Sequence, residues 1–275
     1  MFLRKTFVSI KGENEKMRIF EYIFAPNGAY PPAGMFSTEH NIAVLLCILF
    51  IGVSSFLLRT LDSRGLISFF KISAPIVTLL EFVRIGHSFY HGYTWLDSWM
   101  PLGYCSLFIY ALWMAGYGKG AVRKCGLAFL SCGIIPGAFF VLMPSTSLTS
   151  YPIFHFLSVH SLLYHSAMAL CGIVMIGKSI SPIGKKGKKG YACYAVFFII
   201  FAVISVILNC IYNCNMMFLR EPYNIPIPLL RVIQEKAQPL YTAIIACVYL
   251  IFPYLFTLWI YRITERLTFR KEEKK

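Results

Sequence analysis

Charged residues are scarce in this chain of 275 residues. Aspartate and glutamate together number 12, charged residues make up 14% of the sequence, and hydrophobic residues make up 57%. Soluble globular domains carry about 25% charged residues. The shortage of charge therefore excludes an ordinary soluble domain and indicates a protein that resides in a membrane.

The sequence also lacks the alternation of apolar and polar residues over about ten positions that marks the strands of a membrane β-barrel. It contains instead apolar runs near the roughly 20 residues that cross a bilayer as a helix. Backbone groups in hydrocarbon must pair within their own segment, so each run predicts a helix. We therefore expect an all-α polytopic membrane protein with a single bundle of seven transmembrane helices. The runs cover residues 41–58, 69–92, 99–117, 125–143, 153–177, 191–212 and 239–261.

Neither a soluble domain nor an internal repeat stands out beside this bundle. A cleavable signal peptide is not expected, because residues 1–16 are charged and lack an apolar core. Met17 is an alternative start to Met1. We expect three parts: an N-terminal interfacial or tail segment at 1–40, the transmembrane domain at 41–262 and a basic tail at 263–275.

Acidic residues are too few to balance the 26 lysines and arginines, and the net charge is +14. Basic residues gather in alternate loops, at 59–71, 119–124 and 178–189, and in the C-terminal tail. The positive-inside rule places these loops and the C-terminus in the cytoplasm, with the N-terminus outside. We expect the basic loops to attract anionic lipid and expect no nucleic-acid partner. The short loops favour a bacterial cytoplasmic membrane, and the oligomeric state stays open.

Metal and cofactor signatures are missing. The HExxH zinc motif is absent, and no carboxylate ligand accompanies the helical pair His87 and His91. His155, His160 and His165 step by five residues, which spreads them around a helix. Most of the nine cysteines lie within apolar runs and form no disulfide framework. We therefore predict no metal and no cofactor.

The polar residues that are present share one side of the membrane. With seven spans drawn, helix parity alone places all six histidines near the same surface. Histidine is costly in hydrocarbon, so such a layer marks a candidate site. The layer comprises His40, His87, His91, His155, His160, His165, Cys105, Asn209, Asn213 and Asn215.

A charged pair joins this layer from the second run. Glu81, Arg84, His87 and His91 are spaced by three, three and four residues, which places them on one helical face. A Glu–Arg pair at this spacing can neutralise itself within a bundle. Two interpretations stay open: a structural ion pair with hydrogen-bonded histidines, or the lining of a hydrated pocket.

Cys105 lies close to the start of the third run. Asp97 or Ser98 is suited to cap a helix there, and Pro101 suits its first turn. Cys105 would then lie about one turn into the helix, where the dipole favours a thiolate and burial opposes it. Cys105 is therefore either a nucleophile or a small packing residue.

Five motifs, in order along residues 36–260, give the chain a family resemblance. They are F-S-T-E-H at 36–40, P-L-G-Y-C-S-L at 101–107, G-I-I-P-G-A at 133–138 with Pro144, Y-H-S at 164–166 and N-C-N-M-M-F-L at 213–219. In this order they resemble the motifs of the YwaF family of bacterial integral membrane proteins, which is related to the eukaryotic transmembrane protein 164 group.

The resemblance implies an activity, because the eukaryotic relatives are implicated in acyl transfer between phospholipids through a conserved cysteine. It implies a phospholipid acyltransferase in which Cys105 forms an acyl-thioester and a lysophospholipid can be the acceptor. His165 matches the family histidine best, and His160 is the alternative base. Asn213, Asn215 and amides near Cys105 are the candidates for stabilising an oxyanion.

A rival function uses the same residues without catalysis. A transporter, or a receptor for a small molecule or lipid, would also need an outward-facing polar pocket. Whether the protein is an enzyme therefore stays open at this stage. The predicted lining of the pocket, beside the catalytic candidates, is His40, Glu81, Arg84, His87, His91, Asn213 and Asn215.

Overall fold

The computed structural model describes residues 14–177, 181–185, 187–222 and 227–272. All regular elements in these ranges are helical, which confirms the all-α prediction. Six helical segments are long and apolar enough to cross a membrane, which supports an integral membrane protein. They are formed by α2 (Thr38–Leu58), α3 (Ser63–Tyr90), α6 with α7 (Gly120–Ser131 and Ile134–Leu142), α8 (Phe156–Gly177), α10 (Gly187–Tyr212) and α12 (Gln238–Glu272).

The predicted third span is not a continuous helix, so the count of seven is not confirmed. The predicted run at 99–117 begins at the last residue of α4 (Leu96–Trp99), continues through a non-helical segment at 100–106 and ends with α5 (Leu107–Tyr117). The 11 residues of α5 extend roughly 16 Å, about half the hydrocarbon thickness. Pro101 accounts for the break, because it holds Met100 in an extended conformation that ends α4.

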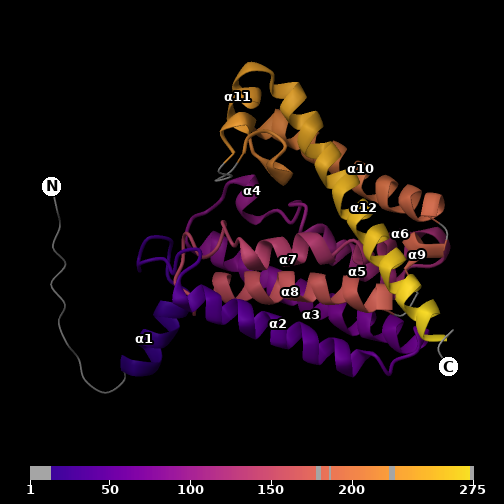
Figure 1. Cartoon of the computed structure of the whole chain (residues 1–275). Helices are drawn as coiled ribbons and strands as arrows, with labels where there is room; N and C mark the ends of the chain where they lie inside the picture. Colours follow the sequence, from indigo (N-terminus) through magenta and orange to yellow (C-terminus); the bar gives the residue numbers. More distant parts are fainter. Residues whose placement is uncertain (1–13, 178–180, 186, 223–226, 273–275) are drawn as a thin grey trace, which may run out of the picture.

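The helices pack as a bundle with a projecting arm. In the bundle, α8 packs against α2 and α7, and α5 packs against α3 and α6. The arm consists of η1 (Met216–Phe218), α11 (Pro228–Lys236) and the adjoining ends of α10 and α12 (Figure 1). The rest of α10 packs against α6, and the rest of α12 packs against α7 and α8. In Figure 1, α12 runs diagonally from α11 at the top of the arm to the C-terminus, and α1 (Asn14–Ile23) lies at the opposite end of the bundle.

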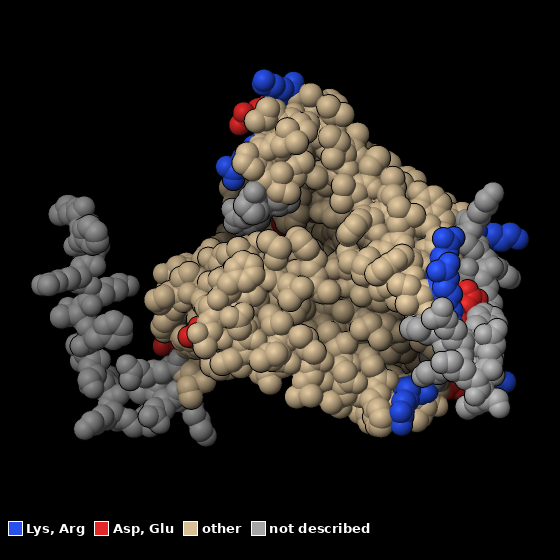
Figure 2. Space-filling view, in the orientation of Figure 1, with Lys and Arg blue, Asp and Glu red and all other residues tan. Residues whose placement is uncertain are grey.

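Basic residues gather at one end of the molecule. Figure 2 shows Lys and Arg at the end where the chain finishes, with a smaller charged group over α11. The α2–α3 connection and α9 (Pro182–Lys185) lie at this same end in Figure 1. Residues 263–272, which the sequence places in a tail, continue α12 as helix.

Close contact between α7 and α8 depends on glycine. A Cβ atom on Gly137 would lie 2.5 Å from the carbonyl oxygen of His165 and 2.6 Å from the amide nitrogen of Ala169. A Cβ on Gly172 of α8 would meet Ile134 of α7 at 2.8 Å. Small residues let the backbones of membrane helices approach in this way. The motif G-I-I-P-G-A therefore sets how closely α7 approaches the helix that carries His165.

We expect Gly137→Ala to lower the stability of the detergent-solubilised protein by about 1–3 kcal/mol, because the added methyl group must push α7 away from α8. Thermal unfolding of the purified protein measures this change. Gly52→Ala in α2 is the matched control, because a Cβ there meets nothing within 4 Å. Equal melting temperatures for the two variants would contradict the close-contact account.

The accessibility of introduced cysteines tests the membrane orientation that the distribution of basic residues predicts. We expect single cysteines introduced at Thr94 and at Lys119, in a chain without its native cysteines, to react with a membrane-impermeant maleimide from opposite sides. The intervening segment at 96–117 would then cross the membrane even though its helix is short. Labelling of both positions from the same side would show that this segment enters the membrane and returns to the side from which it came.

Candidate active site

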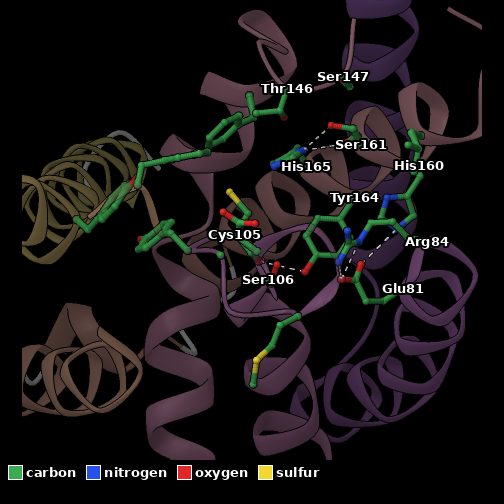
Figure 3. Close-up of a pocket in the computed structure, with 18 residues that line it drawn as sticks. Glu81, Arg84, Cys105, Ser106, Thr146, Ser147, His160, Ser161, Tyr164 and His165 are labelled. Atoms are coloured by element: carbon green, nitrogen blue, oxygen red, sulfur yellow. Dashed lines mark hydrogen bonds and ion pairs between the residues drawn. The ribbon is translucent and has the colours of Figure 1, made fainter. Parts of the chain in front are cut away.

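A cavity of about 320 Å³ lies between α3, α7 and α8 on one side and η1 and α12 on the other. It brings together residues that are far apart in the sequence, as Figure 3 shows. Five of them are residues that the sequence singles out. The polar lining includes Glu81, Arg84, Asp97, Cys105, Ser106, Thr146, Ser147, His160, Ser161, Tyr164 and His165.

Cys105 lies in the turn before α5. The sequence predicts instead a position about one turn into a helix. The N-cap of α5 is Ser106, and Asp97 and Ser98 belong to the separate helix α4. Non-helical backbone at membrane depth is tolerated where it is buried in protein or lines a cavity. The segment at 100–106 does both, because it packs inside the bundle and contributes Cys105 to the cavity.

Two tyrosines hold this turn from opposite sides. The hydroxyl of Tyr164 on α8 donates to the carbonyl of Cys105 at 3.1 Å. The hydroxyl of Tyr104 lies 2.9 Å from that of Tyr194 on α10, which in turn donates to the carbonyl of Tyr249. The position of Cys105 is thus set by its neighbours in space and not by a helix of its own.

His165 has the hydrogen bonding of a base. Its Nδ1 lies 2.7 Å from the carbonyl oxygen of Ser161, which can only accept, so Nδ1 carries the proton. In the neutral ring Nε2 is then an acceptor, and it makes no hydrogen bond within the described residues. Phe140 stacks on the ring at 4.8 Å and fixes its plane. Cys105 and His165 therefore face one cavity as a thiol and an imidazole with a free lone pair.

Glu81 and Arg84 form an ion pair that also anchors α4. Oε1 of Glu81 accepts from Nε and Nη2 of Arg84 at 2.9 and 2.7 Å. Nη1 and Nη2 of Arg84 also donate to the carbonyls of Ser98 and Trp99, at the C-terminal end of α4. The pair therefore satisfies carbonyls that a helix end leaves unpaired, and it fixes the start of the segment that leads to Cys105.

His160 points to the ion pair and not to Cys105. Its Nε2 lies 3.9 Å from Oε2 of Glu81. Figure 3 shows Tyr164 between Cys105 on one side and Glu81, Arg84 and His160 on the other. Of the two candidate bases, His165 thus has the defined acceptor nitrogen, and His160 belongs to the polar group around Glu81.

His40 lies outside the cavity because both of its ring nitrogens are engaged elsewhere. Nδ1 accepts from the amide of Phe36, and Nε2 lies 3.0 Å from the carbonyl of Val141 at the end of α7. The ring is buried and joins the start of α2 to the end of α7.

His87, His91 and His155 form a second cluster outside the cavity. His87 and His155 donate to the carbonyl of Ala25, and His91 donates to that of Phe24. Burial lowers the pKa of His155 to about 4, so this ring is neutral at physiological pH. The cluster fastens the segment after α1 to α3 and α8. Among the described residues, no group of three or more metal-ligating side chains is arranged to hold a metal ion.

Asn213 and Asn215 shape the loop after α10 and do not line the cavity. Asn213 ends α10 in a left-handed conformation (φ 55°), which asparagine tolerates well. Oδ1 of Asn215 accepts from the amides of Arg220 and Glu221. Phe218, also at positive φ (53°), lines the cavity from this loop. The two asparagines therefore act on the site by placing Phe218.

Sequence reasoning did not show which groups hold the two candidate catalytic residues. Tyr164 directly precedes His165 in the motif Y-H-S, and Ser161 lies one turn earlier on the same helix. Phe218 belongs to the motif N-C-N-M-M-F-L, but no local pattern connects Phe218 or Tyr249 to His165, because both come from segments more than 50 residues further along the chain.

Cys105 needs a base if it is to act as a nucleophile. A cysteine thiol is mostly protonated at neutral pH, because its ordinary pKa is about 8.5. It can attack only when a base removes its proton during the reaction.

Comparison with known proteins gives one match. The model of the TMEM164 family matches residues 35–260. No curated protein matches the chain, and no solved structure does.

Proposed function

The chain belongs to the TMEM164 family of membrane proteins, and we propose that it transfers acyl groups between phospholipids through an acyl-thioester on Cys105. The observation that carries the proposal is that Cys105 and His165 line one cavity while the ring of His165 is held with its acceptor nitrogen free. Within the family, the proposal places the chain among YwaF-type members, in a bacterial cytoplasmic membrane.

In the first half-reaction, Cys105 attacks the ester carbonyl of a membrane phospholipid. Nε2 of His165 takes the thiol proton as the carbon–sulfur bond forms, and the ester carbon–oxygen bond then breaks. The same imidazolium returns the proton to the leaving alkoxide, which departs as the hydroxyl of a lysophospholipid. This base is needed because a cysteine thiol is mostly protonated at neutral pH and only the thiolate is a strong nucleophile.

In the second half-reaction, the hydroxyl of an acceptor lysophospholipid attacks the thioester. His165 takes the hydroxyl proton, the new ester bond forms, and the carbon–sulfur bond breaks. The proton passes from His165 to the departing sulfur, which restores the thiol. Each half-reaction thus ends with neutral His165 and needs no metal or redox partner.

Backbone amides at the turn can stabilise the oxyanion in both half-reactions. The N–H groups of Cys105 and Ser106 make no hydrogen bond within the described residues, and Ser106 has no side-chain cap at the start of α5. Donors of this kind, at the positive end of a helix dipole, favour a developing negative charge. They take the place of the Asn213 and Asn215 side chains, which the structure directs elsewhere.

A second candidate function rests on the charged lining of the cavity. Glu81 and Arg84 line the same cavity as Cys105, and buried ion pairs in membrane proteins commonly mark ligand or ion pathways. A transporter, or a receptor for a small molecule or lipid, would use this lining without a covalent step. Detection of a thioester on Cys105 would distinguish the acyltransferase from the transporter or receptor.

We expect Cys105→Ser to abolish acyl exchange in the reconstituted protein, and His165→Ala to slow it by at least about 100-fold, because His165 supplies the base. The protein is reconstituted in phosphatidylcholine vesicles with acyl-labelled phospholipid and lysophospholipid. The measurements are transfer of the label and trapping of a hydroxylamine-sensitive label on Cys105.

Cys210→Ser and His91→Gln are the matched controls, because Cys210 is exposed and His91 bonds only outside the cavity. Both controls should exchange acyl groups as the wild type does. Unchanged exchange in the Cys105 and His165 variants, or no trapped thioester on the wild type, would refute the enzyme and favour the transporter or receptor.

A further inference from the structure

Glu81 and His160 both line the cavity. One hydrogen-bond acceptor of Glu81 and one donor position of His160 make no hydrogen bond within the described residues. The 3.9 Å between Oε2 of Glu81 and Nε2 of His160 is too long for a hydrogen bond. The two side chains are only 7% and 8% exposed. Nε2 of His160 is buried and has no hydrogen-bond partner among the described residues. An unpaired buried group of this kind destabilises the protein, and a ligand that pairs with it removes this cost.

The other atoms around this pair are fixed. Oε1 of Glu81 accepts two hydrogen bonds from Arg84, and Nη1 and Nη2 of Arg84 also donate to the carbonyls of Ser98 and Trp99. Arg84 therefore cannot turn toward a ligand without releasing α4. Oε2 of Glu81 is the acceptor that remains, and a His160 ring that faces a carboxylate carries its hydrogen on Nε2.

We propose that Glu81 and His160 form a subsite for an uncharged hydroxyl group in the headgroup of the lipid substrate. One hydroxyl oxygen at about 2.8 Å from each atom accepts from Nε2 of His160 and donates to Oε2 of Glu81. A headgroup ammonium would meet the guanidinium of Arg84 and the hydrogen on His160. A headgroup anion would meet Glu81. A hydroxyl matches the donor and the acceptor together.

The position of the pair along α8 assigns the subsite to the headgroup. His160 lies five residues nearer than His165 to the start of α8 at Phe156, a rise of about 7.5 Å. The start of a membrane-spanning helix lies toward the membrane surface, where lipid headgroups lie. A lipid whose ester reaches Cys105 and His165 therefore has its headgroup on the side of His160. This inference rests on the proposed acyl transfer and specifies its substrate.

The test compares two acceptors that differ only in the hydroxyls of the headgroup. Lysophosphatidylglycerol and lysophosphatidylpropanol carry the same charge and have headgroups of similar size, and the second lacks the headgroup hydroxyls. In phosphatidylcholine vesicles, we expect the wild type to transfer label to the first at least about tenfold more efficiently, in kcat/KM. His160→Phe, which removes the donor, should reduce this ratio to near one.

Conservative replacement separates a contact with the lipid from a structural role. His160→Gln places an amide donor within similar reach and should restore most of the preference, whereas a purely structural histidine would show no such rescue. His91→Gln, outside the cavity, should keep the wild-type ratio. A wild-type ratio near one, or a ratio that His160→Phe leaves unchanged, overturns the subsite.

Binding to Cys105→Ser separates failure of the subsite from failure of the proposed function. This variant cannot form the thioester, so native mass spectrometry reads lipid binding alone. Preferential binding of lysophosphatidylglycerol that His160→Phe removes would support the subsite even if the wild type traps no thioester. Equal binding of the two lipids would overturn it even if acyl transfer is confirmed.

Discussion

The structure depends on one requirement: backbone N–H and C=O groups in hydrocarbon must find partners inside the protein. Long helices meet it without help, and the segment at 100–106 does not. Its neighbours supply partners: Tyr164 donates to the carbonyl of Cys105, and Arg84 donates to the carbonyls of Ser98 and Trp99 directly before the segment. The N–H groups of Cys105 and Ser106 make no hydrogen bond within the described residues and stay available beside the cavity. Breaking a helix inside a membrane costs free energy, and the hydrogen bonds beside the cavity offset this cost. The break places Cys105 in the lining of the cavity.

Buried charged groups, like buried backbone groups, need partners inside the protein. Glu81 is buried beside an arginine that is itself satisfied by carbonyls, so neither charge is left without a partner. Removing one member would leave a buried charge uncompensated, which is costly. The ion pair therefore does two things in one place: it anchors α4, and it leaves a single carboxylate oxygen and the ring of His160 directed to the cavity.

The histidine layer divides into two groups with different surroundings. His40, His87, His91 and His155 bond to backbone carbonyls and join the N-terminal segments to the bundle. His160 and His165 line the cavity. His165 also bonds to a backbone carbonyl, but through Nδ1, which leaves Nε2 without a hydrogen bond within the described residues. The two groups therefore differ in whether their rings line the cavity, and not in whether they contact the backbone.

The sequence by itself determined that the chain is an all-α membrane protein. It also predicted that the polar residues share one side, and it placed Glu81, Arg84, Cys105, His160 and His165 in a wider set of candidates with His40, His87, His91, Asn213 and Asn215. These follow from hydropathy, helix parity and spacing, which are local properties. The broken third span escaped prediction, because hydropathy reports the depth of a segment and not its conformation. Only the tertiary structure decided which histidine is a free base, which residues hold the turn and which asparagines stay outside. Those outcomes depend on partners such as Tyr164, Val141 and Ala25, whose hydrogen bonds exist only after distant segments have packed.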